Sequence, residues 1–221
     1  MEYKDLAAAI IHDLKNQLQS VLLEGERALA DIPEQYHEPL RPLLGRTRRV
    51  HQDAMQLVTL YRLNERGNFP ADDAWPADTI RHSIECFDSH FPDVQIDVDV
   101  SDECQGYYND FLLQMGLSNL LGNSAQAGAT RIHITAEETD QGLLIRLRDN
   151  GPGFAESFLA ENKLETGDFE TDKAGGTGLG LYFTQLMVEH HSTPTQKAEM
   201  RLSNHGDVSA DGGAQAEILL P

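Results

Sequence analysis

The sequence predicts an all-α helical hairpin followed by an α+β sandwich. Two long segments near the N-terminus carry apolar residues at helical spacing, which indicates two amphipathic helices. A stretch rich in glycine, proline and acidic residues comes next, and such a composition is typical of a domain boundary. Beyond it, helical patterns alternate with short runs of strand character, an order that favours helices packed on one face of a mixed sheet.

The composition is that of a globular protein whose main partner is not a nucleic acid. The chain has 221 residues, which suits one large domain or two modest ones. It holds 17 Lys and Arg against 36 Asp and Glu, a formal charge of -19. This charge argues against nucleic acid, because binding its phosphates requires clustered positive charge. A single nucleotide is still compatible, since backbone N–H groups, a metal and a few side chains can hold one triphosphate.

The cysteines and the hydropathy indicate a cytoplasmic chain. Cys86 and Cys104 are the only cysteines, and we expect both to be reduced packing residues. There is no signal peptide pattern and no apolar run long enough to span a bilayer. If the system senses a stimulus across a membrane, we expect the sensor module and the membrane association to lie outside this chain.

The hairpin is predicted from two apolar stripes, and we expect it to span residues 1–66. In the first helix apolar residues recur every four positions, and Pro33 should end that helix near Asp31 because proline restricts the residue before it. From Leu40 to Tyr61 the spacing is close to a heptad repeat. The stripe residues of the first helix are Leu6, Ile10, Leu14, Leu18 and Leu22.

Two helices alone cannot bury two such stripes. A second copy of the hairpin would complete a four-helix bundle, so we expect a homodimer. The alternative is that both stripes pack on the rest of the same chain.

The remaining segments define a linker and the sandwich. Residues 67–77 are expected as the linker and residues 78–221 as the second domain. Helices are expected at 78–90, at 109–127 and from about 178 to 190. Strands are expected at 95–100, 131–137, 143–148 and 214–220.

The first helix carries a candidate nucleophile. At about 100° per residue, His12 points away from much of the apolar stripe. An exposed imidazole can act as a nucleophile when a carboxylate such as Asp13 holds its tautomer and accepts its proton. An isolated pair of this kind is usually a solvated surface histidine, so the interpretation depends on the rest of the chain.

Two polar segments in the second domain suit a metal and a purine. Asn119 and Asn123 are four residues apart and share a helix face, and an amide oxygen can ligate Mg²⁺ without cancelling its charge. Asp149 follows a predicted strand, where a carboxylate suits an exocyclic amine such as that of adenine. Gly151 and Gly153 permit a tight turn there.

A glycine-rich run precedes the last predicted helix. Residues 175–181 read Gly-Gly-Thr-Gly-Leu-Gly-Leu, and backbone N–H groups at such a helix start can bind an anion. No lysine follows at the spacing of a Walker loop, and no βαβ unit surrounds the run, so a dinucleotide-binding fold is not expected. The polar, acidic stretch 155–174 is expected to form a lid.

Taken together in this order, the segments resemble the sensor histidine kinases. The stretch from His12 to Asn16 resembles the phosphoacceptor box, and residues 119–127 resemble the asparagine box. Residues 149–153 and 176–180 are similar to the two glycine boxes. The resemblance implies a dimerisation and histidine-phosphotransfer hairpin, followed by the Bergerat-type ATP-binding sandwich that gyrase and the heat-shock chaperone ATPases share.

The resemblance also implies roles for single residues. ATP and Mg²⁺ would be the cofactors, with Asn123 as the metal ligand and Asp149 binding the adenine amine. Asn119 stands where the hydrolases of this fold carry a glutamate base, and an amide cannot take a proton from water, which favours transfer to His12. The implied cofactor-binding residues are Asn119, Asn123, Asp149, Gly151, Gly153, Gly176, Thr177, Gly178, Leu179 and Gly180.

The activity implied is autophosphorylation of His12, followed by transfer to an aspartate in a response-regulator receiver domain. Asn16, one helical turn from His12, could orient a water for the reverse dephosphorylation of the regulator. Three alternatives stay open: a chain that is mainly a phosphatase, a non-catalytic dimeric scaffold, and a Bergerat-type protein-serine kinase.

The chain departs from the family pattern at three places. Gln17 replaces a frequent proline, so the first helix is expected to lack the usual kink. The segment after His190 lacks the common His-Gly-Gly, and Gln126 stands where some relatives have a basic residue. None of these changes removes a group that the chemistry requires.

Overall fold

The computed structural model describes residues 3–33, 36–37, 40–64, 69–88, 91–160, 179–206 and 212–221. The chain divides into two compact units, Met1–Asn68 and Phe69–Pro221. In the described part of the chain, no helix has the length and apolar character needed to cross a bilayer.

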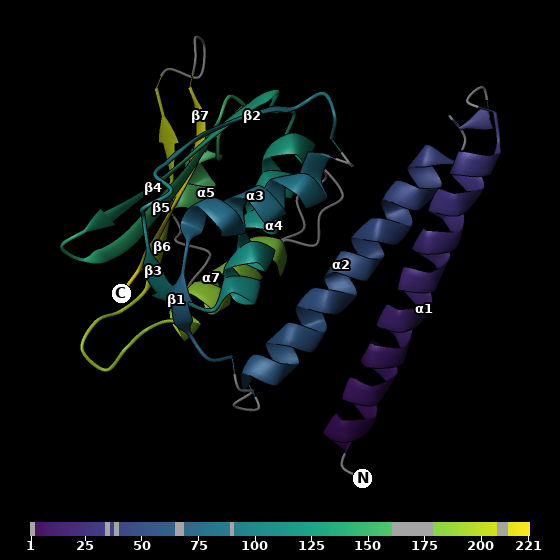
Figure 1. Cartoon of the computed structure of the whole chain (residues 1–221), viewed down its shortest axis with the longest axis horizontal. Helices are drawn as coiled ribbons and strands as arrows, with labels where there is room; N and C mark the ends of the chain where they lie inside the picture. The colour runs from purple at the N-terminus through teal and green to yellow at the C-terminus, as the bar shows by residue number, and fades with distance from the viewer. Residues whose placement is uncertain are drawn as a thin grey trace. The chain divides into compact units, whose positions relative to one another are not determined.

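The first unit is a helical hairpin, as the sequence predicted. Helix α1 spans Tyr3–Asp31 and helix α2 spans Arg41–Asn64, and they pack side by side (Figure 1). Helix α1 runs without interruption through Gln17. A Cβ atom on Gly25 would overlap the side chain of Leu44, so this glycine allows the two helices to approach closely.

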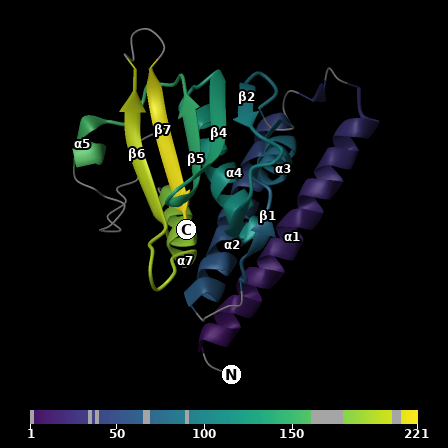
Figure 2. The ribbon, with the colours of Figure 1, turned by 60° about the vertical axis from the view of Figure 1, so that its left-hand side comes forward.

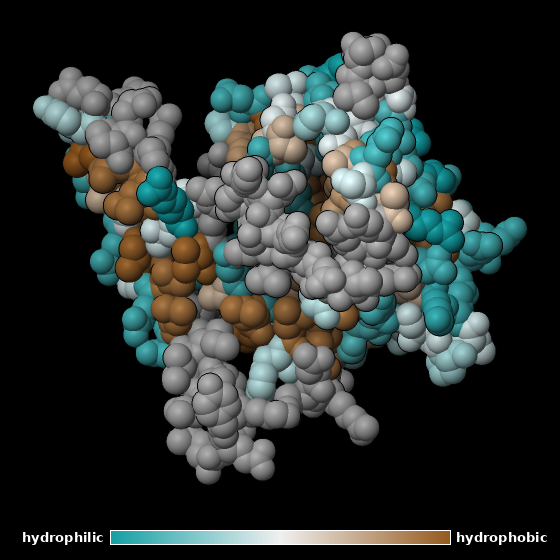
Figure 3. Space-filling model, turned by 180° about the vertical axis from the view of Figure 1, so that it is seen from behind, coloured by the Kyte–Doolittle hydropathy of each residue, from teal (hydrophilic) through white to brown (hydrophobic). Residues whose placement is uncertain are grey.

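The apolar residues of the heptad repeat in α2 differ in burial. Ala54 is buried within the hairpin, whereas three residues spaced seven apart leave much of their surface exposed. Helix α1 has a matching pair seven residues apart, Leu14 and Val21. Figure 3 shows apolar side chains gathered along this face of the hairpin. The exposed α2 residues are Leu43 at 59%, Val50 at 49% and Leu57 at 44%.

The second unit is built on a five-stranded mixed sheet, in the order β2-β4-β5-β7-β6. Strand β2 pairs parallel with β4, and the other neighbours are antiparallel. Strands β2 and β6 are therefore the edges of the sheet. The strands span Gln95–Val100 (β2), Arg131–Thr139 (β4), Gly142–Asp149 (β5), Glu199–His205 (β6) and Gly213–Leu220 (β7).

Three helices gather on one face of this sheet, as Figures 1 and 2 show. They are α3 (Pro76–Asp88), α4 (Asp110–Gln126) and α7 (Leu179–His190). The short helix α5 (Glu156–Ala160) follows strand β5. One apolar core joins the layers, with Leu117 of α4 and Ile145 of β5 almost fully buried. Burying one such side chain contributes about 1.5–3 kcal/mol, so this core is a large stabilising contribution to the unit.

Part of the expected linker belongs to the second unit. Residues 72–74 form strand β1, which pairs antiparallel with β3 (Gly106–Tyr108), and helix α3 begins at Pro76 rather than at residue 78. Proline suits the first turn of a helix, where its missing N–H would have no intrahelical partner.

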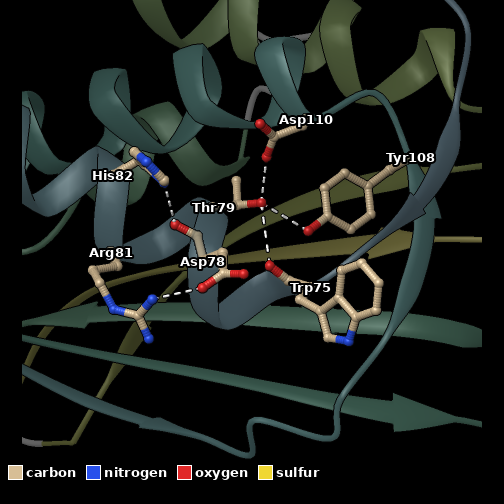
Figure 4. A network of polar contacts seen from close by, with 7 residues as sticks. All are labelled: Trp75, Asp78, Thr79, Arg81, His82, Tyr108 and Asp110. Atoms are coloured by element: carbon tan, nitrogen blue, oxygen red, sulfur yellow. Dashed lines mark hydrogen bonds and ion pairs between the residues drawn. The ribbon is translucent and has the colours of Figure 1, made fainter.

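A polar network joins the buried Thr79 of α3 and Tyr108 of β3 to the exposed Asp110 at the start of α4 (Figure 4). Thr79 Oγ1 lies 2.5 Å from Asp110 Oδ1 and 2.8 Å from Tyr108 OH. The threonine hydroxyl has one proton, so it donates to the carboxylate and accepts from the phenol. Burial raises the pKa of Tyr108 to about 12.

A second contact fixes the start of α4 against the end of α7. His191 Nδ1 donates to Met187 O at 2.8 Å, which leaves Nε2 to accept from the backbone N–H of Asn109 at 3.0 Å. Burial lowers the pKa of His191, since a charged imidazole would lose its hydration there. The Asn109 side chain accepts from Leu112 N and caps helix α4. Helix α4, which carries the candidate asparagines, is thus held at its first turn.

Candidate functional site

The asparagine face of α4 lies against the start of α7. Asn119 is buried, and its Nδ2 lies 3.5 Å from both Gly180 O and Thr184 Oγ1. A Cβ atom on Gly180 would lie 3.8 Å from Asn123 Nδ2 and 3.9 Å from Asn123 Oδ1. The asparagine segment and the end of the second glycine segment, 57 or more residues apart in the sequence, therefore meet in space.

The carboxylate of Asp149 is buried and held by three donors. Its Oδ2 accepts from Ser124 Oγ at 2.6 Å, and its Oδ1 accepts from Gly151 N at 2.8 Å and Ala214 N at 3.2 Å. These donors come from α4, from the turn after β5 and from β7. They fix the orientation of the carboxylate and favour its charged form, which accepts hydrogen bonds. Such a group suits recognition of an amine, which donates them.

Ser124 is a site residue that the sequence reasoning missed. It follows Asn123 on α4, and its hydroxyl reaches Asp149 across 25 positions of the chain. No local signal in the sequence distinguishes Ser124, because Ser118 is likewise a small polar residue beside an asparagine on the same helix.

The turn after Asp149 is shaped by side chain to backbone contacts. Asn150 Oδ1 accepts from Thr130 N and Arg131 N, which ties the end of β5 to the start of β4. Gly151 is buried, and a Cβ atom there would come within 3.0 Å of Asp149 Oδ1. The predicted tight turn is therefore present, with its first glycine packed against the carboxylate.

The hairpin candidates lie together on α1. His12, Asp13 and Asn16 all belong to this helix, although the side chain of His12 lies outside the described part of the structure. Asp13 and Asn16 are exposed. Gln17 Nε2 donates to Asp13 Oδ2 at 2.8 Å, so the residue that replaces the family's frequent proline contacts the candidate proton acceptor.

Several predicted residues lie outside the described residues. These are Gly176, Thr177 and Gly178, together with residues 161–174 of the expected lid. Leu179 is the first residue of α7, and Gly180 is the second. Within the described ranges, no group of three or more His, Cys, Asp or Glu side chains is placed to hold a metal ion.

The family model of histidine kinase-, DNA gyrase B- and HSP90-like ATPases matches residues 108–221. This range contains helix α4, Asp149 and both glycine segments. The chain belongs to this ATPase family. The match covers more than half of the chain and includes every candidate nucleotide-binding residue.

Relatives within this ATPase family extend the similarity to the hairpin. The chain is 28% identical over 197 residues to the tetrathionate sensor histidine kinase TtrS of Salmonella typhimurium, which covers 84% of this chain and 33% of that protein. It is 32% identical over 192 residues to a probable sensor histidine kinase of Mycobacterium tuberculosis, with coverage of 85% and 48%. The chain thus spans less than half the length of either relative, and it corresponds to a histidine kinase catalytic core.

One solved structure of the same fold aligns with most of the chain, and another aligns with about two thirds of it. The chain aligns with the Acinetobacter baumannii histidine kinase AdeS at a TM-score of 0.59 and 17% identity, covering 93% of this chain and 95% of that one. The mycobacterial sensor histidine kinase MprB aligns at a TM-score of 0.56 and 20% identity, over 68% of this chain and 97% of that one. At these identities the likeness concerns the fold, and it confirms the predicted order of helical hairpin and α+β sandwich.

Proposed function

We propose that this chain is the kinase core of a two-component system, which binds ATP with Mg²⁺ and transfers the γ-phosphoryl group to its own His12. The observation that carries the proposal is the buried Asp149 carboxylate, held as an acceptor at the end of β5. The exocyclic amine of adenine is a donor and suits this group, whereas the corresponding oxygen of guanine is an acceptor and does not. Family membership supports the same assignment.

The metal proposal depends on Asn123. Its amide is exposed beside Gly180, so its oxygen is accessible to a hard cation that prefers oxygen ligands. A single protein ligand suits Mg²⁺, which usually takes most of its ligands from water and phosphate. When bound, the ion would neutralise charge on the phosphates.

His12 is the proposed acceptor, and Asn119 supports that choice over water. The lone pair of one ring nitrogen forms the N–P bond as the bond from the γ-phosphorus to the bridging oxygen breaks, and ADP leaves with that electron pair. Asp13 holds the other ring nitrogen and takes its proton. Asn119 cannot act as a base towards water, because an amide does not accept the proton.

The partners are proposed from the hairpin. Exposed apolar residues at seven-residue spacing on both helices suit a four-helix bundle made with a second copy of the chain. The phosphoryl group would pass from His12 to an aspartate of a response-regulator receiver domain. Asn16, exposed on α1, would orient a water for the reverse reaction, hydrolysis of the regulator's acyl phosphate.

The direct test is incubation of the purified chain with radiolabelled ATP and Mg²⁺. We expect label on the wild-type chain and none on His12→Ala. His133→Ala is the matched control, because His133 is exposed on β4 and lies outside the proposed site. Label that persists on His12→Ala would overturn the assignment of His12.

A further inference from the structure

The edge strand β6 ends in two side chains that contact the turn after Asp149. The first is Asn204. Its Oδ1 accepts from the backbone N–H of Phe154 at 2.7 Å, and its Nδ2 donates to the carbonyl of Phe154 at 2.9 Å. One side-chain amide thus satisfies both polar groups of a loop residue, as a neighbouring strand would. The loop has the hydrogen bonds of a sheet at this point without being a strand.

The second side chain is His205. Its Nε2 donates to the carbonyl of Asp149 at 2.9 Å, because a carbonyl can only accept. Strand β7 lies between β6 and β5, and Gly213 is the residue of β7 that pairs with His205. The imidazole therefore reaches Asp149 across Gly213. A Cβ atom on Gly213 would overlap the carbonyl of Asp149, so glycine is needed where the strands pass so closely.

Gly153 shows that the turn is shaped to fit Asn204. This glycine has a φ of +74°, a conformation that other residues rarely adopt. A Cβ atom on it would lie 2.7 Å from Asn204 Oδ1. On the far side of the contact, the rings of Phe154 and Phe158 stack with centroids 5.6 Å apart, which continues the packing into α5.

We infer that Asn204 and His205, together the β6 clamp, are positioning residues for nucleotide binding. The β6 clamp holds the backbone of Asp149 at one end of the turn and that of Phe154 at the other. It thereby keeps the Asp149 carboxylate aimed at the adenine amine before nucleotide arrives. This inference rests on the proposed ATP site, and it assigns the affinity of that site in part to a strand that carries none of its predicted residues.

A positioning role and a merely structural role predict different results. If the β6 clamp only stabilised the fold, its loss would lower the melting temperature and leave the Kd of the folded protein unchanged. If it pre-forms the turn, its loss makes nucleotide binding pay for ordering the turn. Two neutral hydrogen bonds are lost in Asn204→Ala, so we expect the Kd for ATP with Mg²⁺ to rise about tenfold.

The test uses the full chain and calorimetric titration with ATP and Mg²⁺. Asn204→Asp keeps the acceptor for Phe154 N but turns a second acceptor towards the Phe154 carbonyl, so its Kd should be at least as high as that of Asn204→Ala. His205→Gln retains a side-chain donor and should bind more tightly than His205→Ala. Arg201→Ala is the control on the same strand, because Arg201 pairs with Glu199 and not with the turn; its Kd should equal that of the wild type.

Two further readouts separate the outcomes. In Asn204→Ala, the KM for ATP should rise while kcat changes less than about twofold, and the amide of Phe154 should exchange faster with solvent. If the wild-type chain binds ATP and the Asn204→Ala chain binds it with the same Kd, this inference is wrong and the proposed function stands. A wild-type chain that binds no ATP would overturn the proposed function and this inference with it.

Discussion

The two units bury their apolar residues to different extents. Among the described residues, the sandwich has one continuous core that joins the sheet with α3, α4 and α7. The hairpin buries Leu22, Leu44 and Ala54, yet it leaves several leucine and valine side chains exposed. The sandwich therefore buries its apolar residues within one unit, whereas the hairpin has an apolar face that suits a second copy. We expect association to be a property of the hairpin and nucleotide binding a property of the sandwich.

The charge is also divided unequally. Residues 1–68 contain nine Lys and Arg against ten Asp and Glu, whereas residues 69–221 contain eight against 26. The unit that would bind an anionic triphosphate is therefore the strongly acidic one. Binding there has to be local, through backbone N–H groups, a metal ion and fixed side chains rather than through the overall field.

The largest expected effect comes from a matched pair of leucine truncations. Leu117 in α4 is fully buried, so Leu117→Ala should lower the free energy of unfolding of the sandwich by about 2–5 kcal/mol. Leu43 in α2 is 59% exposed in the single chain, so Leu43→Ala should weaken association instead. Denaturation and sedimentation at two protein concentrations separate the two effects. A Leu43→Ala chain that associates as tightly as the wild type would show that the exposed apolar face of the hairpin does not mediate association.

The next effect is an alkaline loss of stability in the sandwich. Folded Tyr108 keeps its proton to a pH of about 12, whereas unfolded tyrosine releases it at its ordinary pKa of 10.0. The stabilisation is complete below pH 10 and is lost as the pH rises towards 12, a change of about 2 kcal/mol. Tyr108→Phe should be about 1 kcal/mol less stable than wild type at pH 8 because the bond to Thr79 is lost.

That difference should shrink, and then reverse, in urea titrations between pH 10 and pH 12. A difference that stays constant over this range would mean that Tyr108 does not hold its proton in the folded state.

A smaller loss is expected on the acid side. Burial lowers the pKa of His191 from its ordinary 6.5, so at a pH just below 6.5 this imidazole is protonated in the unfolded chain and neutral in the folded chain. The stabilisation is present above pH 6.5 and is lost as the pH falls below it, by at most about 1.4 kcal/mol per pH unit. His191→Gln should lack this part of the acid sensitivity. Melting temperatures from pH 7.5 down to 5 would measure it, and equal slopes for both proteins would refute it.

The smallest effect is expected in the hairpin. Gln17 and Asp13 are exposed and four residues apart on α1, and such pairs contribute about 0.2–0.5 kcal/mol to a helix. Gln17→Ala should therefore hardly change stability, but it frees Asp13 and should change the rate of His12 phosphorylation. Glu24→Ala, which removes the comparable contact from Ser20, is the control. Identical phosphorylation rates in all three proteins would show that Gln17 does not influence Asp13.

The long elements could be predicted from the sequence because their periodicity is local. The helix expected at 109–127 is α4, and the strand expected at 95–100 is β2. Strands β1 and β3 were missed because three residues are too few to show an alternation. Strand β6 was missed because only Met200 and Leu202 supply apolar character in it.

The site residues could be predicted only where they stand close together in the sequence. Asp149 stands in such a segment, but the contacts that hold it come from distant positions. Ser124 lies 25 residues away in the chain, and His205 lies 56 away. Asn204 likewise contacts a residue 50 positions distant. No local pattern marks these three residues, because their roles arise only when α4, β5 and β6 come together.

The most direct test of His12 phosphorylation is to determine the position and chemistry of the transferred phosphate. The full chain would be incubated with ATP and Mg²⁺, digested, and mapped by mass spectrometry before and after acid treatment. We predict phosphate on the peptide that contains His12, lost in acid and absent from Asp149→Asn protein. An acid-stable phosphate on a serine or threonine, or release of inorganic phosphate without labelled protein, would contradict the account.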